Sequence, residues 1–499
     1  MDDDGLSTHL VARRTLSSSA FQIGAQAITV FTGLVRSVIL ARLLMPQDFG
    51  LVALAIIFSN LVWNTTTLGI DSRLVQKKKL NALGLSTHLT LRIALSALAF
   101  LILLALTPLF RLAYPDQPDL ASVVMAYAAL NILRAFNLTP FVLLKRRLAF
   151  RRVALIGVLS SLVMLVVAPL LAWAGWGFWS LVVGESVTGT LVSTLGLWLF
   201  RRPMRFSLRL DRATARDLIG FGKFVMLTNQ LRFALDRFDD FWAGTALGQV
   251  ALGYYSKSYE FATYPRRIIS RPLQEVFFSA YSRLQDDRLN LSKVFFRTNS
   301  YVVRMGFLFS PILVLVAPEF VYYLLGEKWL PMVFTFQLMV VYCLFDPLLV
   351  TASNLLTACG APQKMTSVRI AQLVFFVPAV IVGAALWQNN GIALAADGML
   401  VVGLIGVFRM TRAFVDISLR RLFWAPTLGL VAGGAAFLLA SFILQARGSL
   451  LWAIVKGLVY AIPFLGVLLL LEWRDYQAAF RSADNLLGLS RFVRRPTSG

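Results

Sequence analysis

Cysteine and histidine are almost absent from this chain of 499 residues. The only cysteines are Cys343 and Cys359, and the only histidines are His9 and His88. These four residues cannot supply a disulfide framework, a zinc site or a Cys–His nucleophile. We therefore expect no metal and no cofactor, and we expect both thiols to act as small apolar residues in apolar surroundings.

Charge is also scarce. Asp, Glu, Lys and Arg make up 15% of the chain and hydrophobic residues 58%, whereas a soluble protein is about a quarter charged. Several stretches without any charge match or approach the roughly 20 residues that a membrane-spanning helix needs; they are Ile93–Phe110, Val153–Gly184, Ile370–Ala396 and Leu422–Ala446. Strand-like alternation over about ten residues is missing, which disfavours a transmembrane barrel. The composition predicts an all-α polytopic membrane protein.

About 14 segments have the length that a bilayer requires. Their approximate limits are 16–43, 48–68, 85–111, 118–144, 153–175, 177–200, 216–244, 249–282, 298–325, 329–358, 365–388, 391–418, 423–446 and 449–472. A faint repeat relates residues 41–50 to residues 244–253, because each joins two spans through a Pro or Gly breaker, Gln and a Gly that opens a helix. We therefore predict two six-helix lobes (1–212 and 213–421), two additional helices (422–472) and a cytoplasmic tail (473–499).

The excess of basic residues gives a formal net charge of +23. Lys and Arg gather in alternate loops, which is the positive-inside pattern of a membrane protein rather than the basic stripe of a nucleic-acid-binding protein. This asymmetry predicts that both termini are cytoplasmic and that nucleic acid is not a partner. The start of the sequence, MDDD, has no basic region and is not expected to be a signal peptide.

Two predicted spans between Leu218 and Leu284 are exceptional because they carry charge along their length. The first has polar residues on one helical face, and so does the second, at steps of three or four. These residues are Asn229, Arg232, Asp236, Asp239 and Asp240 in the first span, and Lys257, Glu260, Tyr264, Arg267, Arg271 and Glu275 in the second. A charge at the bilayer centre costs roughly 2.5–3.5 kcal/mol, so it normally faces protein or water. We expect the two helices to line a cavity.

A purely structural role is also open for these charges. An antiparallel pair of helices that turns near residue 246 would place Asp236 level with Lys257, and Arg232 level with Glu260. The four would then neutralise one another. Arg266 lies about 100° from Arg267 around the helix and can snorkel to the membrane surface.

Five stretches resemble a known family. They are ARLLMPQDFGLVAL (41–54), LGIDSRLVQ (68–76), LGQVALGYYSKSY (247–259), SRLQDD (282–287) and LGEKWLP (325–331). In these stretches the chain resembles bacterial oligosaccharide flippases of the Wzx type, within the multidrug/oligosaccharidyl-lipid/polysaccharide exporter superfamily. The last two spans and the tail add nothing diagnostic.

The resemblance implies a bacterial inner-membrane transporter that carries polyprenyl-pyrophosphate-linked oligosaccharides for exopolysaccharide or lipopolysaccharide synthesis, by alternating access of a cationic cavity. It implies membrane lipids as partners, with the pathway's polymerase and chain-length proteins as further candidates. Arginine suits the pyrophosphate because its planar fork pairs with phosphate oxygens. The candidate cavity residues are Arg36, Arg266, Arg267, Arg271 and Tyr264, and those that could couple transport to an ion or set the cavity charge are Arg232, Asp236, Asp239, Asp240, Lys257, Glu260 and Glu275.

Two other function classes remain to be weighed. A small-molecule or drug antiporter of the same fold would use acidic cavity residues to move cationic compounds. A membrane polymerase or ligase is disfavoured because such an enzyme needs a long extracytoplasmic loop with catalytic residues, and every such loop here is short. The sequence predicts a transporter and not an enzyme, and it does not specify the sugar or the coupling ion.

Overall fold

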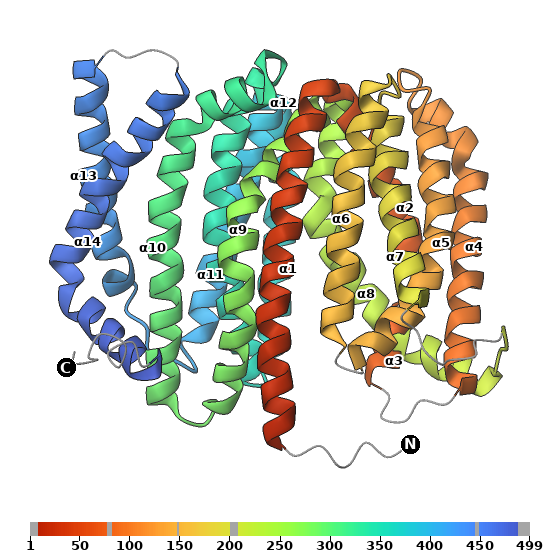
Figure 1. Ribbon diagram of the computed structural model, residues 1–499, viewed down its shortest axis with the longest axis horizontal. Coiled ribbons are helices and arrows are strands. Elements are labelled where there is room, and N and C mark those ends of the chain that lie inside the picture. Colours follow the sequence, from red (N-terminus) through yellow and green to blue (C-terminus); the bar gives the residue numbers. More distant parts are fainter. Residues whose placement is uncertain (1–7, 77–81, 147–148, 200–207, 445–448, 488–499) are drawn as a thin grey trace, which may run out of the picture. The chain divides into compact units, whose positions relative to one another are not determined.

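The computed structural model describes residues 8–76, 82–146, 149–199, 208–444 and 449–487. Within these ranges the side chains of some helical residues, among them 8–20, 268–276 and 474–487, are not described. The described backbone forms helices and contains no strand (Figure 1). In chain order the α-helices are α1 (Thr8–Leu43), α2 (Pro46–Thr66), α3 (Ile70–Gln76), α4 (Ala82–Ala113), α5 (Leu120–Arg146), α6 (Phe150–Trp173), α7 (Thr188–Leu199), α8 (Arg212–Trp242), α9 (Gln249–Arg283), α10 (Arg288–Phe320), α11 (Val333–Ala358), α12 (Pro362–Thr411), α13 (Leu419–Leu444) and α14 (Leu450–Leu487).

Four further helical segments complete the described chain. Three are π-helices, η1 (Ser180–Val187), η2 (Ala243–Leu247) and η3 (Val321–Leu325), and η4 (Glu327–Met332) is a 3₁₀ helix. The first continues directly into α7, and η2 and η3 extend α8 and α10. Most π-helical turns in proteins are single-turn insertions, frequently at functional sites.

Eleven helices in the described part are long and apolar enough to cross a membrane, which confirms the predicted all-α polytopic class. The backbone of α12 leaves helical angles at Trp387 and Gln388, so its 50 residues have room for two spans. With α8 and α9, which are long enough but more charged, the described helices are compatible with the predicted fourteen. The short helix α3 was not predicted. The last helix continues to Leu487 after a break at Glu472, where we predicted it to end.

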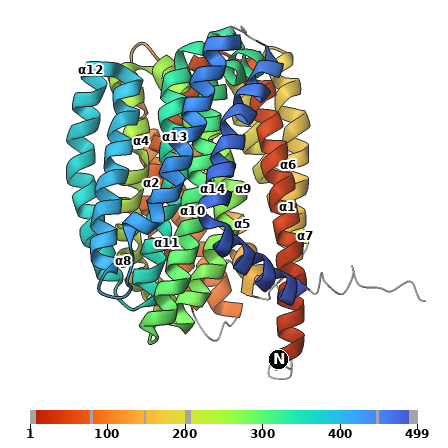
Figure 2. The same ribbon diagram turned by 90° about the vertical axis from the view of Figure 1, so that its left-hand side faces the viewer.

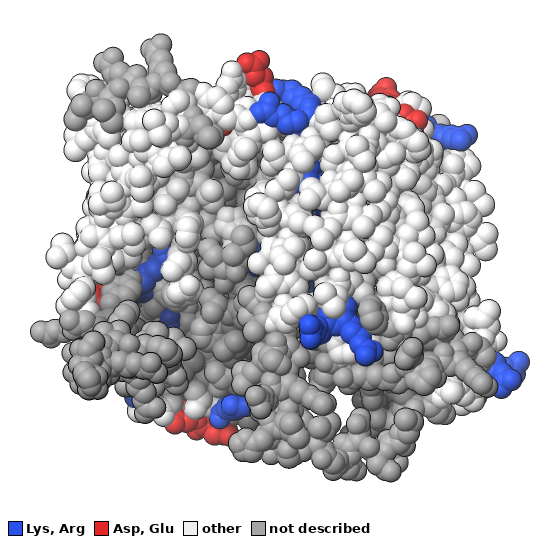
Figure 3. Space-filling view, viewed as in Figure 1, with Lys and Arg blue, Asp and Glu red and all other residues white. Residues whose placement is uncertain are grey.

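Leucines cover the outward face of α4 in a manner suited to lipid. The most exposed of them are Leu98, Leu101, Leu104, Leu109 and Leu112. In Figure 3 the surface on the side of α4 and α5 is uncharged over most of its height. Contiguous apolar surface of this kind marks a contact with membrane or partner rather than with water.

The described chain forms two compact units, each made from separate stretches. Unit 1 contains Met1–Pro272, Leu324–Met339 and Gln372–Met399, and unit 2 contains Leu273–Tyr323, Val340–Ala371 and Leu400–Gly499. Helices α9, α11 and α12 therefore contribute residues to both units. The division into lobes at residues 212 and 421, which follows chain order, stays a prediction.

Glycines bring η1 and the start of α7 against α6 in unit 1. A Cβ on Gly184 would overlap the backbone of Ala168 and lie 2.7 Å from its Cβ, and a Cβ on Gly189 would lie 2.6 Å from the Met164 sulfur. Helix α1 also packs on α6, and the two lie side by side in Figures 1 and 2. The close approach fixes the residue after Gly184, which is Glu185, near α1.

The short helix α3 holds the start of α8. Arg73 donates to Asp217 of α8 with Nη2 2.7 Å from Oδ1. Asp71 contacts the buried His88 at 3.0 Å and Arg92 at 3.1 Å, both on α4. Burial would raise the pKa of the Asp71 carboxyl, but the hydrogen bond from His88 and the charge of Arg92 outweigh burial and lower it.

Unit 2 attaches the last two helices to α10. Gly429 and Gly433 of α13 let that helix approach α14, because a Cβ at either position would lie 2.8 Å or less from the ring of Phe464 or Tyr460. Two ion pairs then join α14 to α10: Lys456 to Glu319 at 2.5 Å, and Arg304 to Glu472 with Nε 2.6 Å from Oε2.

Breaking one of these ion pairs should destabilise unit 2. In the Glu472→Leu variant, Arg304 would keep its charge in a largely buried position without its carboxylate, and we expect a loss on the order of 3 kcal/mol. The SDS concentration at half-unfolding should fall accordingly. The double variant Arg304→Leu/Glu472→Leu removes both charges and should recover most of the loss; an unchanged midpoint in the single variant would contradict the argument.

Candidate functional site

The polar face predicted on α9 is turned partly toward α1. Lys257 is only 5% exposed, and its ammonium group donates to Glu260 at 2.7 Å and to the hydroxyl of Ser37 on α1 at 2.9 Å. It also lies 4.1 Å from the centroid of the Phe49 ring, a distance at which a cation is attracted to the ring face. The buried charge of Lys257 is therefore stabilised by three groups, the Glu260 carboxylate, the Ser37 hydroxyl and the Phe49 ring.

Further along the same face of α9, Tyr264 and Arg267 continue the polar surface. The Tyr264 hydroxyl donates to Glu260 Oε1 at 3.3 Å, and the Arg267 guanidinium lies 5.3 Å from the centroid of the Tyr264 ring. Gly33 of α1 faces the same hydroxyl, since a Cβ there would lie 3.7 Å from it. Of the predicted cavity residues, Tyr264 and Arg267 thus lie together with Lys257 and Glu260.

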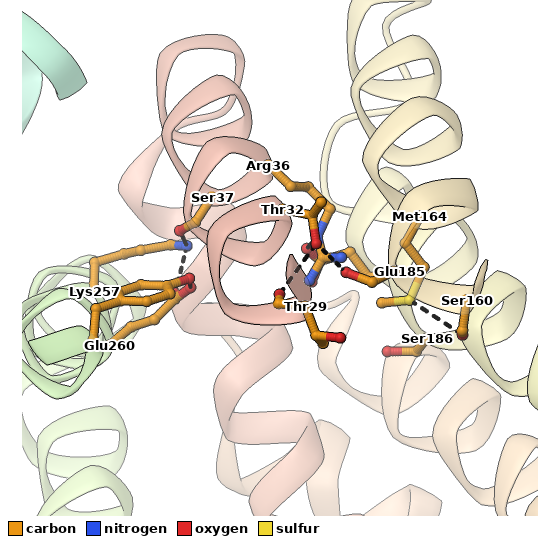
Figure 4. A network of polar contacts seen from close by, with 12 residues as sticks. Thr29, Thr32, Arg36, Ser37, Ser160, Met164, Glu185, Ser186, Lys257 and Glu260 are labelled. Atoms are coloured by element: carbon orange, nitrogen blue, oxygen red, sulfur yellow. Dashed lines mark hydrogen bonds and ion pairs between the residues drawn. The ribbon is translucent and has the colours of Figure 1, made fainter. Parts of the chain in front are cut away.

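Arg36 precedes Ser37 on α1 and makes its contact with a different neighbour. Its Nε donates to Glu185 Oε1 at 2.6 Å, and Figure 4 shows the two polar contacts on either side of α1: Lys257 and Glu260 reaching Ser37, and Arg36 reaching Glu185. The Arg36 and Glu185 side chains are 15% and 29% exposed, so the pair is not sealed inside the protein. Glu185 belongs to the π-helix η1.

Behind Glu185, α5 contributes a second polar group. The Tyr127 hydroxyl lies 2.8 Å from that of Ser186. Arg134 donates to the Thr190 hydroxyl and to the side-chain Oδ1 of Asn131, each at 3.3 Å. Among the described residues these neutral groups are the only hydrogen-bond partners of Arg134, which forms no ion pair there.

The acidic residues of α8 are paired differently from the structural alternative given above. Arg232 pairs with Asp236 of its own helix at 3.3 Å, and the Arg232 side chain is 81% exposed. Because Lys257 pairs with Glu260 of its own helix as well, the expected pairing of α8 with α9 across the turn is wrong. The helical period of a sequence assigns a residue to one face of its helix. It does not determine whether that residue pairs with a side chain of the same helix or of the next helix.

Asp239 and Asp240, at the end of α8, form a separate buried group. Asp239 accepts a hydrogen bond from the Tyr255 hydroxyl of α9 at 2.7 Å. Asp240 accepts one from Arg237 at 2.7 Å. The first contact joins α8 to α9, the second lies within α8, and neither includes Lys257 or Glu260.

Three other predicted residues lie on α9. Arg266 is half-buried. The side chains of Arg271 and Glu275 lie outside the described residues, so their proposed roles stay predictions.

The two segments that the sequence repeat relates are in contact in unit 1. A Cβ on Gly50 would overlap the carbonyl oxygen of Gln249, and a Cβ on Gly253 would overlap that of Pro46. The first turns of α2 and α9 thus touch through backbone atoms in a reciprocal arrangement. We call this contact, formed by Pro46–Gly50 and Gln249–Gly253, the glycine contact.

The segment around η4 reinforces the glycine contact. Lys328 donates to the carbonyl oxygens of Arg42 and Leu44 at the end of α1, at 2.8 and 2.7 Å. The indole of the fully buried Trp329 donates to the carbonyl oxygen of Ala41 at 2.8 Å. A cation at a helix C-terminus satisfies carbonyl groups that have no helical partner and interacts favourably with the helix dipole.

From the sequence, Glu185 is one of a few isolated charges that could couple or gate transport, although a buried ion pair is favoured, and the predicted site does not include it. It is the only charged residue between Val153 and Phe200, and an isolated carboxylate in a membrane helix indicates a function or a partner. Lys328 and Trp329 were noted only as part of the motif LGEKWLP.

Comparisons with known proteins agree with this architecture. A family described as "Polysaccharide biosynthesis protein" matches residues 39–334. The lipopolysaccharide biosynthesis protein WzxC of Escherichia coli K12 is 24% identical over 427 residues, which cover 83% of this chain and 85% of that protein. The succinoglycan biosynthesis transport protein ExoT of Rhizobium meliloti 1021 is 29% identical over 253 residues, half of each chain.

Two kinds of solved structure share the fold. The lipid II flippase MurJ, in an inward closed conformation, is similar with a TM-score of 0.72 at 13% identity, covering 92% of this chain and 99% of that one. An inward-facing multidrug resistance transporter of the MATE family has a TM-score of 0.57 at 15% identity, covering 79% and 98%. At such low identities the likeness concerns the fold alone. The resemblance to Wzx-type proteins is confirmed by the family match, which extends over more than half of the sequence, and the chain belongs to the polysaccharide biosynthesis protein family.

Proposed function

We propose that this protein is a flippase for lipid-linked oligosaccharides, and that its substrate is an oligosaccharide repeat unit on a polyprenyl pyrophosphate. The observation that carries the proposal is the set of cationic side chains on or beside α1, namely Arg36, Lys257 and Arg267, at positions within helices long enough to span a membrane. The names of WzxC and ExoT, which refer to polysaccharide synthesis and transport, support a transporter rather than an enzyme.

The chemistry of the substrate explains the need for these cations. The polar head and pyrophosphate must pass about 30 Å of hydrocarbon, whereas the polyprenyl tail can remain in lipid. A guanidinium pairs with phosphate oxygens through parallel hydrogen bonds and keeps its charge at any biological pH. Tyr264, beside Arg267, can donate to or stack on a sugar ring. The site therefore offers groups for both parts of the head.

Transport would proceed by alternating access, and the glycine contact would be the closed end in the conformation described here. The similarity of the fold to an inward closed flippase supports this assignment. The opening of that end requires separation of the first turns of α2 and α9 and release of Lys328 from the end of α1. The basic loops favour a cytoplasmic side of the inner membrane for both termini. The pathway's polymerase and chain-length proteins would act on the exported units.

Removal of two cations tests the proposal. In the native host with the chromosomal gene deleted, a plasmid carrying Arg36→Gln/Arg267→Gln should yield at least about tenfold less surface polymer than the wild-type plasmid, because each charge-assisted hydrogen bond to phosphate is worth about 1.5–3 kcal/mol. Arg216→Gln, an exposed position near the start of α8, is the matched control. Normal polymer from the double variant, at a normal protein level in the membrane, would overturn the assignment of these residues.

A drug antiporter is the second candidate, favoured by the similarity to a multidrug transporter and by the buried carboxylates Asp239 and Asp240. It would extrude cationic dyes in a manner that depends on those carboxylates. Dye efflux from cells that express the wild type or Asp239→Asn separates the two functions, because a flippase for an anionic lipid has no reason to move a cationic dye.

A further inference from the structure

Three features of the sequence and fold set the position of Glu185 apart. It is the one charged residue in a long apolar stretch, it lies in a π-helix, and the glycine before it packs against the backbone of Ala168 on α6. A π-helical segment is costly to maintain and is found frequently at functional sites. An ordinary α-helical register would rotate Glu185 to another face of the helix.

The carboxylate of Glu185 holds Arg36 by one strong hydrogen bond, Nε to Oε1 at 2.6 Å. Both side chains keep some exposure, and Glu185 keeps more. A carboxylate and a phosphate bind a guanidinium in the same way, through oxygen atoms in the plane of the fork. A pyrophosphate that reaches Arg36 therefore competes with Glu185 for the same donors.

A second cation, Arg134 of α5, contacts the helix that continues from η1, because it donates to Thr190. Tyr127, whose hydroxyl lies 2.8 Å from that of Ser186, precedes Arg134 by seven residues, about two turns, on α5. Arg134 forms no ion pair among the described residues and donates only to Thr190 and Asn131, at the long distance of 3.3 Å. Arg36 of α1 is thus the ion-pair partner of Glu185, and α5, which contacts the next residue Ser186, carries Arg134 without an ion pair among the described residues.

We propose that Glu185 is an exchangeable counterion: it pairs with Arg36 while the site is empty, and it moves toward Arg134 when the pyrophosphate of the substrate takes its place on Arg36. The inference rests on the proposed function, which makes Arg36 a ligand of the pyrophosphate. Glu185 is a positioning residue in this scheme, because it acts on the substrate through Arg36. Its return to Arg36 would help to release the product.

The scheme predicts opposite effects on binding and transport when the Glu185 charge is removed. In purified full-length Glu185→Gln in lipid nanodiscs, Arg36 is free for the ligand, so a fluorescent polyprenyl pyrophosphate should bind about tenfold tighter than to the wild type. Polymer export in cells should nevertheless fall, because nothing displaces the pyrophosphate from Arg36. Loss of a merely structural ion pair would weaken binding and export together.

Further variants keep the test decisive. Arg36→Gln should weaken binding, and Arg36→Gln/Glu185→Gln should bind like Arg36→Gln alone, because the effect of Glu185 passes through Arg36. Glu185→Asp, which retains the charge but shortens the side chain, should show an affinity between the wild type and Glu185→Gln, and it replaces the latter if that variant does not fold. Arg134→Gln should keep wild-type affinity and export less polymer.

The probe also separates failure of this inference from failure of the proposed function. If the wild type binds polyprenyl pyrophosphate no better than the neutral polyprenol of the same length, the proposed substrate is wrong, and the counterion scheme falls with it. If the wild type prefers the pyrophosphate and Arg36→Gln weakens binding, but Glu185→Gln and Glu185→Asp bind no tighter than wild type, the proposed function stands and the counterion role is overturned.

Discussion

Replacement of Gly253 by valine is expected to abolish polymer export while the protein still reaches the membrane. A Cβ at this position would overlap the carbonyl oxygen of Pro46 and lie 2.6 Å from its carbonyl carbon. These are backbone atoms in the first turn of α2, so they cannot rotate away as the end of a flexible side chain could. The first turns of α2 and α9 would be pushed apart, and the end of the protein that we propose they close would stay open. Gly50→Val should act in the same way on Gln249.

A cysteine at Leu44 reports the opening directly. Leu44 is buried and its carbonyl oxygen accepts from Lys328, so maleimide should reach a Leu44→Cys thiol only when this end opens. With Cys343 and Cys359 replaced by alanine, the labelling rate in nanodiscs should rise at least about tenfold in Gly253→Val, which corresponds to about 1.4 kcal/mol in the opening equilibrium.

Gly220→Val is the matched control, since a Cβ at this exposed position of α8 would meet no atom within 4 Å. It should leave labelling and export unchanged. Wild-type labelling and export in Gly253→Val would show that the glycine contact is not needed in the transport cycle.

Lys257→Met should be among the most destabilising substitutions in unit 1. Methionine has nearly the same length but removes the charge, so Glu260 loses the ammonium group 2.7 Å away and Ser37 loses its donor. Removal of one partner of a buried ion pair typically lowers the free energy of unfolding by about 3–5 kcal/mol. Because 33% of the Glu260 side chain is exposed, we expect a loss at the lower end of this range, about 3 kcal/mol. The SDS midpoint of unfolding should fall by the corresponding amount.

A double-mutant cycle identifies the pair as the cause. In Lys257→Met/Glu260→Gln the carboxylate is neutral, and we expect at least half of the lost stability to return. Arg288→Met, which breaks the exposed pair with Asp416, serves as the control and should cost less than about 1 kcal/mol. If the effects of Lys257→Met and Glu260→Gln simply add, the two side chains do not stabilise each other.

Much of the helical order could be predicted from hydrophobic runs alone. Most limits of the predicted spans lie within about four residues of an observed helix limit, but α1 and α10 begin eight and ten residues earlier than predicted and α12 ends seven residues earlier. The break in α12 at Trp387 and Gln388 falls where two spans were separated. The fourteenth, α14, begins as predicted but extends to Leu487. The seven-residue helix α3 was missed because its sequence, IDSRLVQ, is too short and too polar to show a span.

The site could be predicted only in part, for a physical reason. Steps of three and four placed Lys257, Glu260, Tyr264 and Arg267 on one face, and α9 has that face. The contact between Lys257 and Ser37 joins residues 220 positions apart, and no local period encodes such a pairing. The position of Glu185 depends on a π-helical register that hydropathy does not reveal.

The polarity of α8 and α9 has a consequence for how the chain enters the membrane during synthesis. Neither helix is apolar enough to partition into lipid alone, because each insertion of an unpaired charge costs several kcal/mol. When α8 leaves the ribosome, its polar groups need hydrogen-bond or ion-pair partners from other helices before they can enter the membrane. The Ser37 hydroxyl for Lys257 is already present on α1, which was made first. Helices α8 and α9 therefore insert against the earlier helices rather than into lipid alone. Biogenesis of the second half of the protein then depends on correct assembly of the first.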